Sequence, residues 1–374
     1  MTTSVLVFIP SPGAGHLPPA VELAKLLLDR DQRLSITIII MNMLLEAKPN
    51  TESPASTPRL RLIDIPSDES TKNLVSNSPN TFISDFLEHQ KPHVRNIVGG
   101  ITESHSVRLA GFVVDMFFID MADVANEFGV PTYLYFTAGA ASLGLMFGLQ
   151  AKHDDEGFDV TDLKDSELEV SIPSYANPVP AKVFPLVMFD KNGGSKTFIR
   201  LARKYREAKG IIVNTFEELE KHALESFSRS NANIPPVFPV GPILNLKNST
   251  NDGKADKIMA WLNDQPEMSV VFLCFGSMGS FSQEQVKEIA VALEKSGQRF
   301  LWSLRLPASK EKMGQLPKDY ENYDDVLPEG FLERTSGVGK KVKEMKEKSR
   351  FAVSEGGSSH ASIGRFLDHV IVIQ

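Results

Sequence analysis

Residues 4–29, SVLVFIPSPGAGHLPPAVELAKLLLD, pass from a short apolar run through a glycine-bearing loop into a helical pattern. A run such as 4–9 is typical of a strand buried on both faces, and the apolar spacing of 17–29 is typical of an amphipathic helix. The stretch therefore predicts the opening strand-loop-helix unit of a doubly wound α/β fold. Ligands bind to such folds beyond the carboxyl ends of the strands, so the loop at 10–16 is a candidate binding site.

The same alternation continues through the N-terminal part of the chain. Buried strands are predicted at 4–9, 35–40, 60–65, 109–114, 132–136 and 210–215. An amphipathic helix is predicted at 82–101, and a polar, proline-bearing excursion at 154–191. Alternating strands and helices indicate a parallel sheet. We expect the α/β fold class with two Rossmann-like lobes, and residues 1–244 form the first lobe.

The C-terminal part shows a weaker form of this pattern. A stretch rich in Asn, Ser and Asp predicts a linker at 245–255, and residues 256–340 then begin a second lobe. Only two strands are predicted there, at 270–274 and 299–304. Because two strands seldom make a stable sheet, we expect the C-terminal lobe to be truncated.

Helices are predicted for the remaining residues, 341–374, as a charged helix at 341–354 and a last helix at 362–370. The basic run that begins at Lys340 is interleaved with glutamates, which is typical of a solvated helix face.

Composition excludes several classes of function. The formal net charge is −7 and there is no long basic block, so binding to nucleic acid or to an anionic membrane is not favoured. The apolar stretch at 36–45 is shorter than the roughly 18 residues that a membrane helix needs. The N-terminal residues lack the basic segment of a signal peptide. We expect a cytoplasmic monomer that binds small molecules.

The chain has one cysteine, Cys274, which lies in an apolar run. An intrachain disulfide is therefore impossible, and we expect Cys274 to be a buried structural thiol.

The histidine at the end of the first loop is the first candidate for chemistry. His16 is predicted to lie at a helix N-terminus, where the helix dipole favours the neutral imidazole and suits it to act as a general base. Asp115 follows the predicted strand 109–114 and could orient His16 and stabilise its imidazolium. Each residue also has a plainer interpretation, since His16 could cap the helix and Asp115 could cap a helix or form a turn.

Other polar groups follow strands in both lobes. Thr137 could offer its hydroxyl to the same site as His16, or simply start a turn. In the second lobe, Gly276 and Ser277 follow the strand at 270–274, so backbone N–H groups and the Ser277 hydroxyl could bind phosphate. A turn without a ligand is an equally open interpretation there.

Two other chemistries fit the sequence poorly. The loop matches a dinucleotide fingerprint at Gly13 and Gly15, but Pro18 stands where a third glycine is needed, so nicotinamide binding is weakly supported. His89 and His93 are four residues apart, but we expect Pro92 to interrupt their helix, and no zinc signature follows. No metal site is predicted.

Several passages resemble the plant family of UDP-dependent glycosyltransferases. They are 10–22 (PSPGAGHLPPAVE), 115–131 (DMFFIDMADVANEFGVP), 136–139 (FTAG), 269–280 (SVVFLCFGSMGS) and 327–340 (LPEGFLERTSGVGK), and 341–370 resembles the extreme C-terminus of that family. The resemblance implies a GT-B fold, with acceptor bound mainly by the N-terminal lobe and UDP-sugar, a co-substrate, mainly by the C-terminal lobe. It implies an inverting displacement without a further cofactor.

The resemblance also assigns roles to individual residues. It implies that His16 deprotonates the acceptor hydroxyl, that Asp115 holds the histidine tautomer, and that Thr137 contacts the sugar. Ser277, beside Gly276, is implied to contact the diphosphate. For the acceptor pocket we expect Gly15, Phe117 and Phe118, together with the stretch 184–189; core packing is the alternative for the phenylalanines.

One block of the family is not found in this sequence. It begins near W-A-P-Q, contains H-C-G-W-N-S, grips the nucleotide sugar, and is expected between Lys340 and Lys341. We therefore carry two hypotheses: a glycosyltransferase that moves a sugar, most simply glucose, to a hydroxyl of a small lipophilic plant metabolite, and a non-catalytic acceptor-binding remnant of such an enzyme. A nicotinamide-dependent oxidoreductase is a third, which rests on fold class alone.

Overall fold

The computed structural model describes most of the chain. The described residues are 3–13, 15–42, 57–66, 82–103, 106–229, 233–244, 254–267, 269–276, 279–307, 320–335 and 355–371. The chain divides into two compact units, the first made of 1–44, 52–244 and 348–374, and the second of 45–51 and 245–347. Among the described residues, none of the helices combines the length and the hydrophobicity that a membrane span requires.

The first unit is built on a seven-stranded parallel sheet. Its strands, in spatial order, are β3 (Leu60–Ile65), β2 (Leu34–Met41), β1 (Thr3–Ile9), β4 (Val107–Asp115), β5 (Thr132–Phe136), β8 (Gly210–Val213) and β9 (Val237–Pro239). The strand order changes direction between β1 and β4, where Ile9 pairs with Val114. The carboxyl ends of these two strands therefore meet at the switch point, where such sheets bind ligands.

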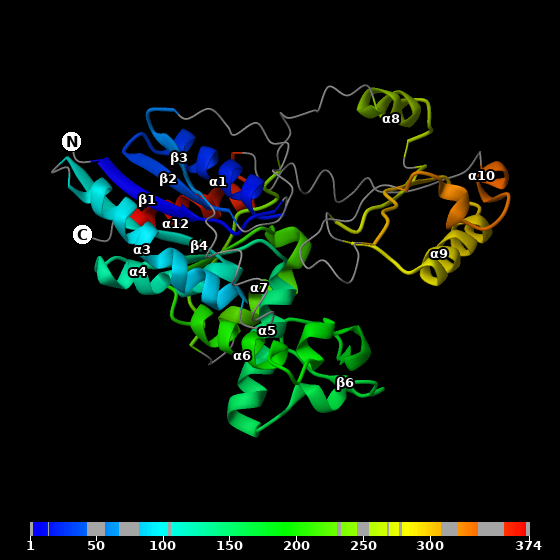
Figure 1. The fold of residues 1–374 in the computed structure, drawn as a ribbon, viewed down its shortest axis with the longest axis horizontal. Coiled ribbons are helices and arrows are strands. Elements are labelled where there is room, and N and C mark those ends of the chain that lie inside the picture. Colours follow the sequence, from blue (N-terminus) through cyan, green and yellow to red (C-terminus); the bar gives the residue numbers. More distant parts are fainter. Residues whose placement is uncertain are drawn as a thin grey trace. The chain divides into compact units, whose positions relative to one another are not determined.

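Helices cover both faces of this sheet (Figure 1). The helices of the unit within the described residues are α1 (Leu17–Arg30), α3 (Phe82–Thr102), α4 (Ala122–Glu127), α5 (Ala140–Glu156), α6 (Gly194–Tyr205), α7 (Glu217–Arg229) and α12 (Ser358–Ile371), with a 3-10 turn, η1 (Met116–Met121), after β4. Val5, Val7 and Ile9 of β1 pack against helices of one face, and Leu6 and Phe8 pack with α1 and α12 on the other. The alternation of side chains along each strand thus builds two cores.

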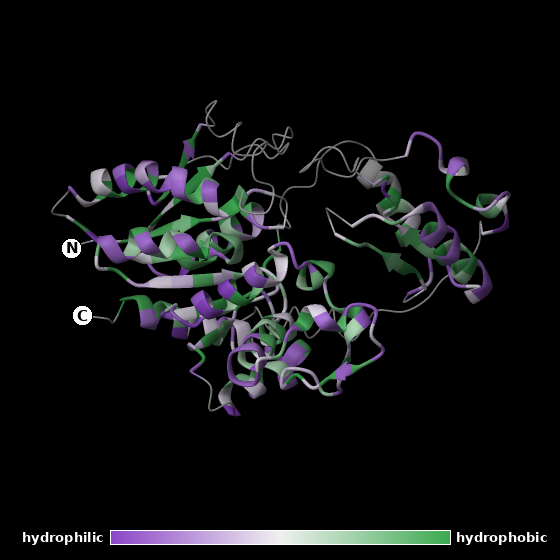
Figure 2. Cartoon of the chain, turned by 60° about the horizontal axis from the view of Figure 1, so that its bottom comes forward, coloured by the Kyte–Doolittle hydropathy of each residue, from purple (hydrophilic) through white to green (hydrophobic). Residues whose placement is uncertain are grey.

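The hydrophobic residues of the first unit are concentrated in its large sheet, and the helices around the sheet carry hydrophilic residues as well (Figure 2). The strands of the large sheet are mostly hydrophobic, as expected for a sheet buried on both faces. The predicted parallel α/β sheet is confirmed at all six predicted strands of this lobe, and β9 is an addition.

The excursion after α5 contains short elements with a core of their own. These are η2 (Val160–Leu163), β6 (Glu169–Val170), β7 (Val179–Pro180), η3 (Ala181–Val183) and η4 (Leu186–Phe189), and β6 and β7 pair antiparallel. Phe184 and Phe189 stack on each other inside this separate core, with ring centroids 6.4 Å apart. Core packing is therefore the role of these two phenylalanines.

The second unit has a small parallel sheet. Its described elements are α8 (Lys254–Asn263), β10 (Val271–Leu273), α9 (Gln283–Ser296), β11 (Phe300–Trp302), η5 (Tyr323–Asp325) and α10 (Phe331–Arg334). A capping box between Ser282 and Gln285 starts α9. The two predicted strands of this lobe are confirmed, and they pair with each other.

Two expectations were wrong. Pro92 does not interrupt its helix, since α3 runs from Phe82 to Thr102 through it. The buried face of α3, which includes Val94 and Val98, packs into the core and offsets the lost backbone hydrogen bond. Cys274 is exposed rather than buried, because it lies just beyond the end of β10. The predicted charged helix at 341–354 lies outside the described residues.

Candidate active site

The loop between β1 and α1 brings His16 to the carboxyl edge of the large sheet. Gly13 adopts a φ of +121°, a conformation that favours glycine, and its carbonyl accepts a hydrogen bond from the His16 backbone N–H at 3.1 Å. His16 occupies the N-cap position of α1, but its side chain makes no capping hydrogen bond. The helix-capping interpretation therefore does not describe the His16 imidazole.

The imidazole is paired with a buried carboxylate. His16 Nδ1 lies 2.8 Å from Asp115 Oδ2, and the side chains of His16 and Asp115 are 22% and 0% exposed. A carboxylate accepts, so Nδ1 carries a proton, and in the neutral imidazole Nε2 is then the nitrogen with the free lone pair. This is the arrangement in which a histidine serves as a base while a carboxylate stabilises the charge that forms on it.

Asp115 is also held from its other oxygen. Asp115 Oδ1 accepts hydrogen bonds from the Ser11 hydroxyl at 2.8 Å and from the Phe117 backbone N–H at 3.0 Å. The Phe117 bond makes Asp115 the cap of η1, so the capping interpretation and the pairing with His16 are both correct. Ser11 was missed in the sequence, since a serine between two prolines carries no pattern of its own.

Two buried tyrosines, Tyr135 and Tyr205, lie near Asp115. Burial raises the pKa of Tyr135 and of Tyr205 well above the ordinary range, and the negative charge of Asp115 raises both further. The Tyr205 hydroxyl donates to the Met116 carbonyl at 2.7 Å. Because the Asp115 side chain is 0% exposed, water screens its interaction with His16 only weakly.

Thr137 comes to the same place from β5. Its Oγ1 lies 3.2 Å from His16 Nδ1 and donates to Met116 Sδ at 3.7 Å. The nearby N-terminus of α5 is occupied by the carboxylate of Glu220, which accepts from the backbone N–H groups of Ala140 and Ala141 at 2.8 and 2.9 Å. Glu220 was also missed, because 80 residues separate it from Ala140.

The three residues expected around the acceptor, Phe117, Gly15 and Phe118, differ in their exposure to solvent. Phe117 is 38% exposed, and the centroid of its ring lies 5.3 Å from that of His16. Gly15 is exposed, and no atom would contact a Cβ placed on it. Phe118 is 1% exposed and packs near Phe86 in the core, which favours the core-packing alternative for this residue.

The remaining candidates belong to the second unit. Gly276 follows β10 with a φ of +77°, a conformation that favours glycine. Ser277 lies outside the described residues. Across the described part of the chain, no three His, Cys, Asp or Glu side chains are grouped so that they could hold a metal ion.

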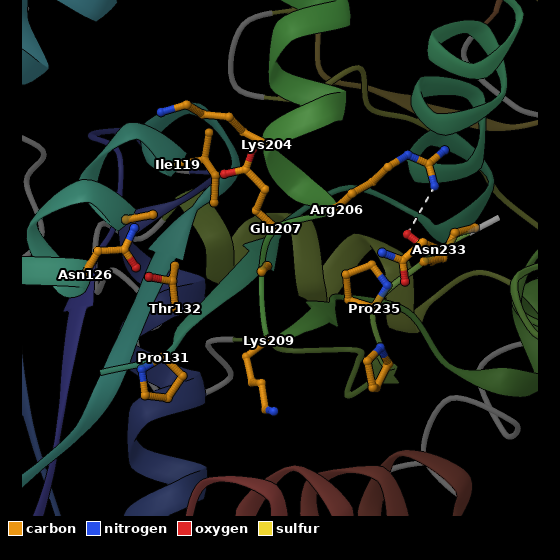
Figure 3. Close-up of a pocket in the computed structure, with 14 residues that line it drawn as sticks. Ile119, Asn126, Pro131, Thr132, Lys204, Arg206, Glu207, Lys209, Asn233 and Pro235 are labelled. Carbon is orange, nitrogen blue, oxygen red and sulfur yellow. Dashed lines mark hydrogen bonds between the residues drawn. The ribbon is translucent and has the colours of Figure 1, made fainter. Parts of the chain in front are cut away.

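A separate pocket of about 410 Å³ lies at the amino-terminal ends of the strands of the large sheet, around the starts of β5 and β8 (Figure 3). None of the predicted site residues lines it. Its Lys204 is paired with Asp120 at 2.8 Å, and Arg206 donates to Gln150 at 2.6 Å and to the carbonyl of Asn233 at 3.4 Å. These cations are thus engaged within the protein.

Comparisons with known proteins find relatives that match this chain along almost its whole length. The sequence model of the family described as "UDP-glucoronosyl and UDP-glucosyl transferase" matches residues 213–316. The chain is 64% identical over 369 residues to UDP-glycosyltransferase 71E1 of Stevia rebaudiana, covering 99% of this chain and 76% of that protein. It is 47% identical over 383 residues to UDP-glucose flavonoid 3-O-glucosyltransferase 6 of Fragaria ananassa, covering 98% and 77%.

Two solved structures of plant proteins are also similar to this chain. A UGT transferase from Siraitia grosvenorii in complex with UDP superposes with a TM-score of 0.82 at 35% identity, covering 99% of this chain and all of that one. Medicago truncatula UGT71G1 complexed with UDP-glucose superposes with a TM-score of 0.77 at 33% identity, covering 98% of each chain. This chain therefore shares its fold with these two proteins.

Proposed function

The chain belongs to the plant UDP-glycosyltransferase family, whose members transfer a sugar from a UDP-sugar, and from this premise we propose its reaction. We propose that it transfers glucose, with inversion, to a hydroxyl group of a small lipophilic plant metabolite. Glucose is supported by relatives: one is described as a UDP-glucose flavonoid glucosyltransferase, and a structural neighbour holds UDP-glucose. The observation that carries the proposal is the 2.8 Å contact between His16 and the buried Asp115.

The proposed chemistry is a single displacement. His16 Nε2 removes the proton of the acceptor hydroxyl. At the same time the oxygen of that hydroxyl attacks the anomeric carbon of the sugar, and the bond from the anomeric carbon to UDP breaks. The electron pair of this bond leaves with the diphosphate, and the proton stays on His16. Asp115 keeps Nδ1 protonated and stabilises the imidazolium that forms. Attack opposite the leaving group inverts the anomeric configuration.

Other roles in the proposal follow from the family resemblance. Thr137, whose hydroxyl lies beside His16, contacts the sugar, and Gly276 with Ser277 contacts the diphosphate. For the acceptor we propose the exposed face of Phe117 and the open backbone at Gly15. An exposed aromatic ring next to the base suits a flat, apolar acceptor such as a phenolic compound.

We also propose that the donor site is reduced by a missing block between Lys340 and Lys341. Support comes from the sequence, which has no W-A-P-Q or H-C-G-W-N-S motif, and from the Stevia rebaudiana and Fragaria ananassa proteins, of whose lengths the chain spans 76% and 77%. Since that block carries donor-gripping residues in the family, UDP-glucose binding and turnover are expected to be weak.

The missing block also favours a second candidate function, a non-catalytic protein that binds acceptor molecules. The first unit, with its large sheet and the His16 site, supports acceptor binding in either case. Calorimetric titration of the purified chain with UDP-glucose, UDP and a flavonol separates the two functions. Saturable binding of UDP-glucose supports transfer, whereas flavonol binding without any UDP-glucose or UDP binding supports the acceptor-binding function and contradicts transfer.

A further inference from the structure

Ser11 connects two loops that meet at the switch point of the large sheet. It lies two residues beyond the end of β1 and is 4% exposed. Its hydroxyl donates to Asp115 at the end of the neighbouring strand β4, 104 residues further along the chain. The only donors to Asp115 among the described side chains are thus Ser11 and His16.

The two oxygens of Asp115 have different partners. Oδ2 faces His16, and Oδ1 takes the Ser11 hydroxyl and the Phe117 backbone N–H. The last torsion of an aspartate side chain is broad, so its carboxylate plane is set by its hydrogen bonds rather than by the rotamer. Ser11 and Phe117 together fix the plane in which Oδ2 meets Nδ1.

Solvent cannot replace Ser11 in this role. The Asp115 side chain is 0% exposed, so a lost donor is not exchanged for bulk water. A competing acceptor is also present, because Thr137 Oγ1 lies 3.2 Å from the same His16 Nδ1. If the carboxylate turns away, the Nδ1 proton is left to Thr137, a neutral hydroxyl that stabilises an imidazolium much less than a carboxylate does.

We propose that Ser11 is a positioning residue for sugar transfer, whose hydroxyl holds the Asp115 carboxylate so that His16 keeps its Nδ1 proton on Asp115. This rests on the proposed function, but the geometry that it concerns can be measured without turnover. Ser11 itself contacts neither base nor substrate in the mechanism. Its effect is on the orientation of the pair.

The test compares Ser11→Ala with Ser359→Ala. Ser359 is a matched control because it is also a buried serine of the first unit, and its hydroxyl donates to the Gly241 carbonyl at 2.5 Å, away from His16. In ¹⁵N-labelled protein, the downfield Nδ1 proton resonance of His16 is expected to move upfield or broaden in Ser11→Ala and to stay in place in Ser359→Ala. Ser11→Cys, which keeps a weak donor of similar size, is expected to lie between wild type and Ser11→Ala.

Kinetics give the second readout. Ser11→Ala is expected to lower kcat about tenfold with an unchanged KM for the acceptor, because only the base and not the pocket is disturbed. An unchanged His16 resonance in a folded Ser11→Ala protein overturns the proposal, as does an equal change in Ser359→Ala. If the wild-type chain transfers no sugar, the resonance still decides the role of Ser11, so the failure of the proposed function is recognised separately.

Discussion

The Asp115 carboxylate receives hydrogen bonds from three residues of which only one is a close neighbour in the sequence. Phe117 is two residues away, whereas Ser11 and His16 come from the loop after β1. The pairing of His16 with Asp115 could be predicted, because both residues follow strands that meet at a switch point. The role of Ser11 could not be predicted, because it depends on how deeply the loop after β1 packs against β4.

The first prediction concerns the charge of Asp115. In Asp115→Asn, the amide nitrogen would face His16 Nδ1 and donate to it, so the imidazole proton would move to Nε2 and the base would be lost. We expect kcat for glucosylation of a flavonol to fall by about a thousandfold, with little change in the melting temperature. A folded variant that keeps more than half of the wild-type rate would rule out the pairing as the catalytic device.

At the scale of elements, the apolar runs of the sequence predicted the strands of the large sheet. They did not predict its shortest strand or the contacts between distant elements. The six predicted strands of the large sheet are long apolar stretches, but β9 has three residues beside several prolines and resembles a loop. α3 continues through Pro92 because tertiary packing outweighs the local cost of one proline. Glu220 reaches α5 from α7, which no local pattern indicates.

A second prediction concerns the contact between η1 and α6. Asp120 is buried and pairs with Arg200 at 2.7 Å and Lys204 at 2.8 Å. Burial raises the pKa of Asp120, but hydrogen bonds from these two cations outweigh it, so the pKa lies below its usual range. The stabilisation is therefore present above the unfolded pKa, near 4, and is lost as pH falls through the lower folded pKa.

Asp120→Asn tests this linkage. We expect the wild type to lose stability more steeply than Asp120→Asn as pH falls from about 5 to about 2, because only the wild type must protonate a paired carboxylate. Thermal unfolding at a series of pH values measures the two slopes. Asp155→Asn, which changes an exposed aspartate of α5, is the control and should follow the wild type. Parallel curves for wild type and Asp120→Asn would refute the assignment.

At the scale of the whole molecule, the last helix belongs to the first unit. α12 fills one core of the large sheet with Ile363, Phe366, Leu367 and Val370. The Phe366 ring packs against Tyr133 and Phe238, at centroid distances of 5.1 and 5.6 Å. The helix itself could be predicted from its apolar spacing, but its partner could not, because nothing in a local pattern specifies a distant sheet.

A third prediction follows from this packing. Phe366→Ala should lower the unfolding free energy of the first unit by about 3 to 5 kcal/mol, since it removes a fully buried ring. Trp261 and Trp302, the only two tryptophans, both lie in the second unit. Denaturation followed by far-UV circular dichroism should therefore shift, while the tryptophan fluorescence transition should not. Arg365→Ala, on the exposed side of α12, is the control. A shift in Phe366→Ala no larger than that in Arg365→Ala would contradict the stabilising role of the Phe366 ring.

The central claim is that the His16 site performs sugar transfer from UDP-glucose. Its most direct test is to incubate the purified chain, in excess over acceptor, with UDP-glucose and a flavonol, and to measure the glucoside formed by the wild type and by His16→Gln. We predict slow glucoside formation by the wild type and a rate lower by at least about a thousandfold in the variant. Absence of glucoside from a folded wild-type chain that binds the flavonol, or an equal rate in His16→Gln, would contradict the account.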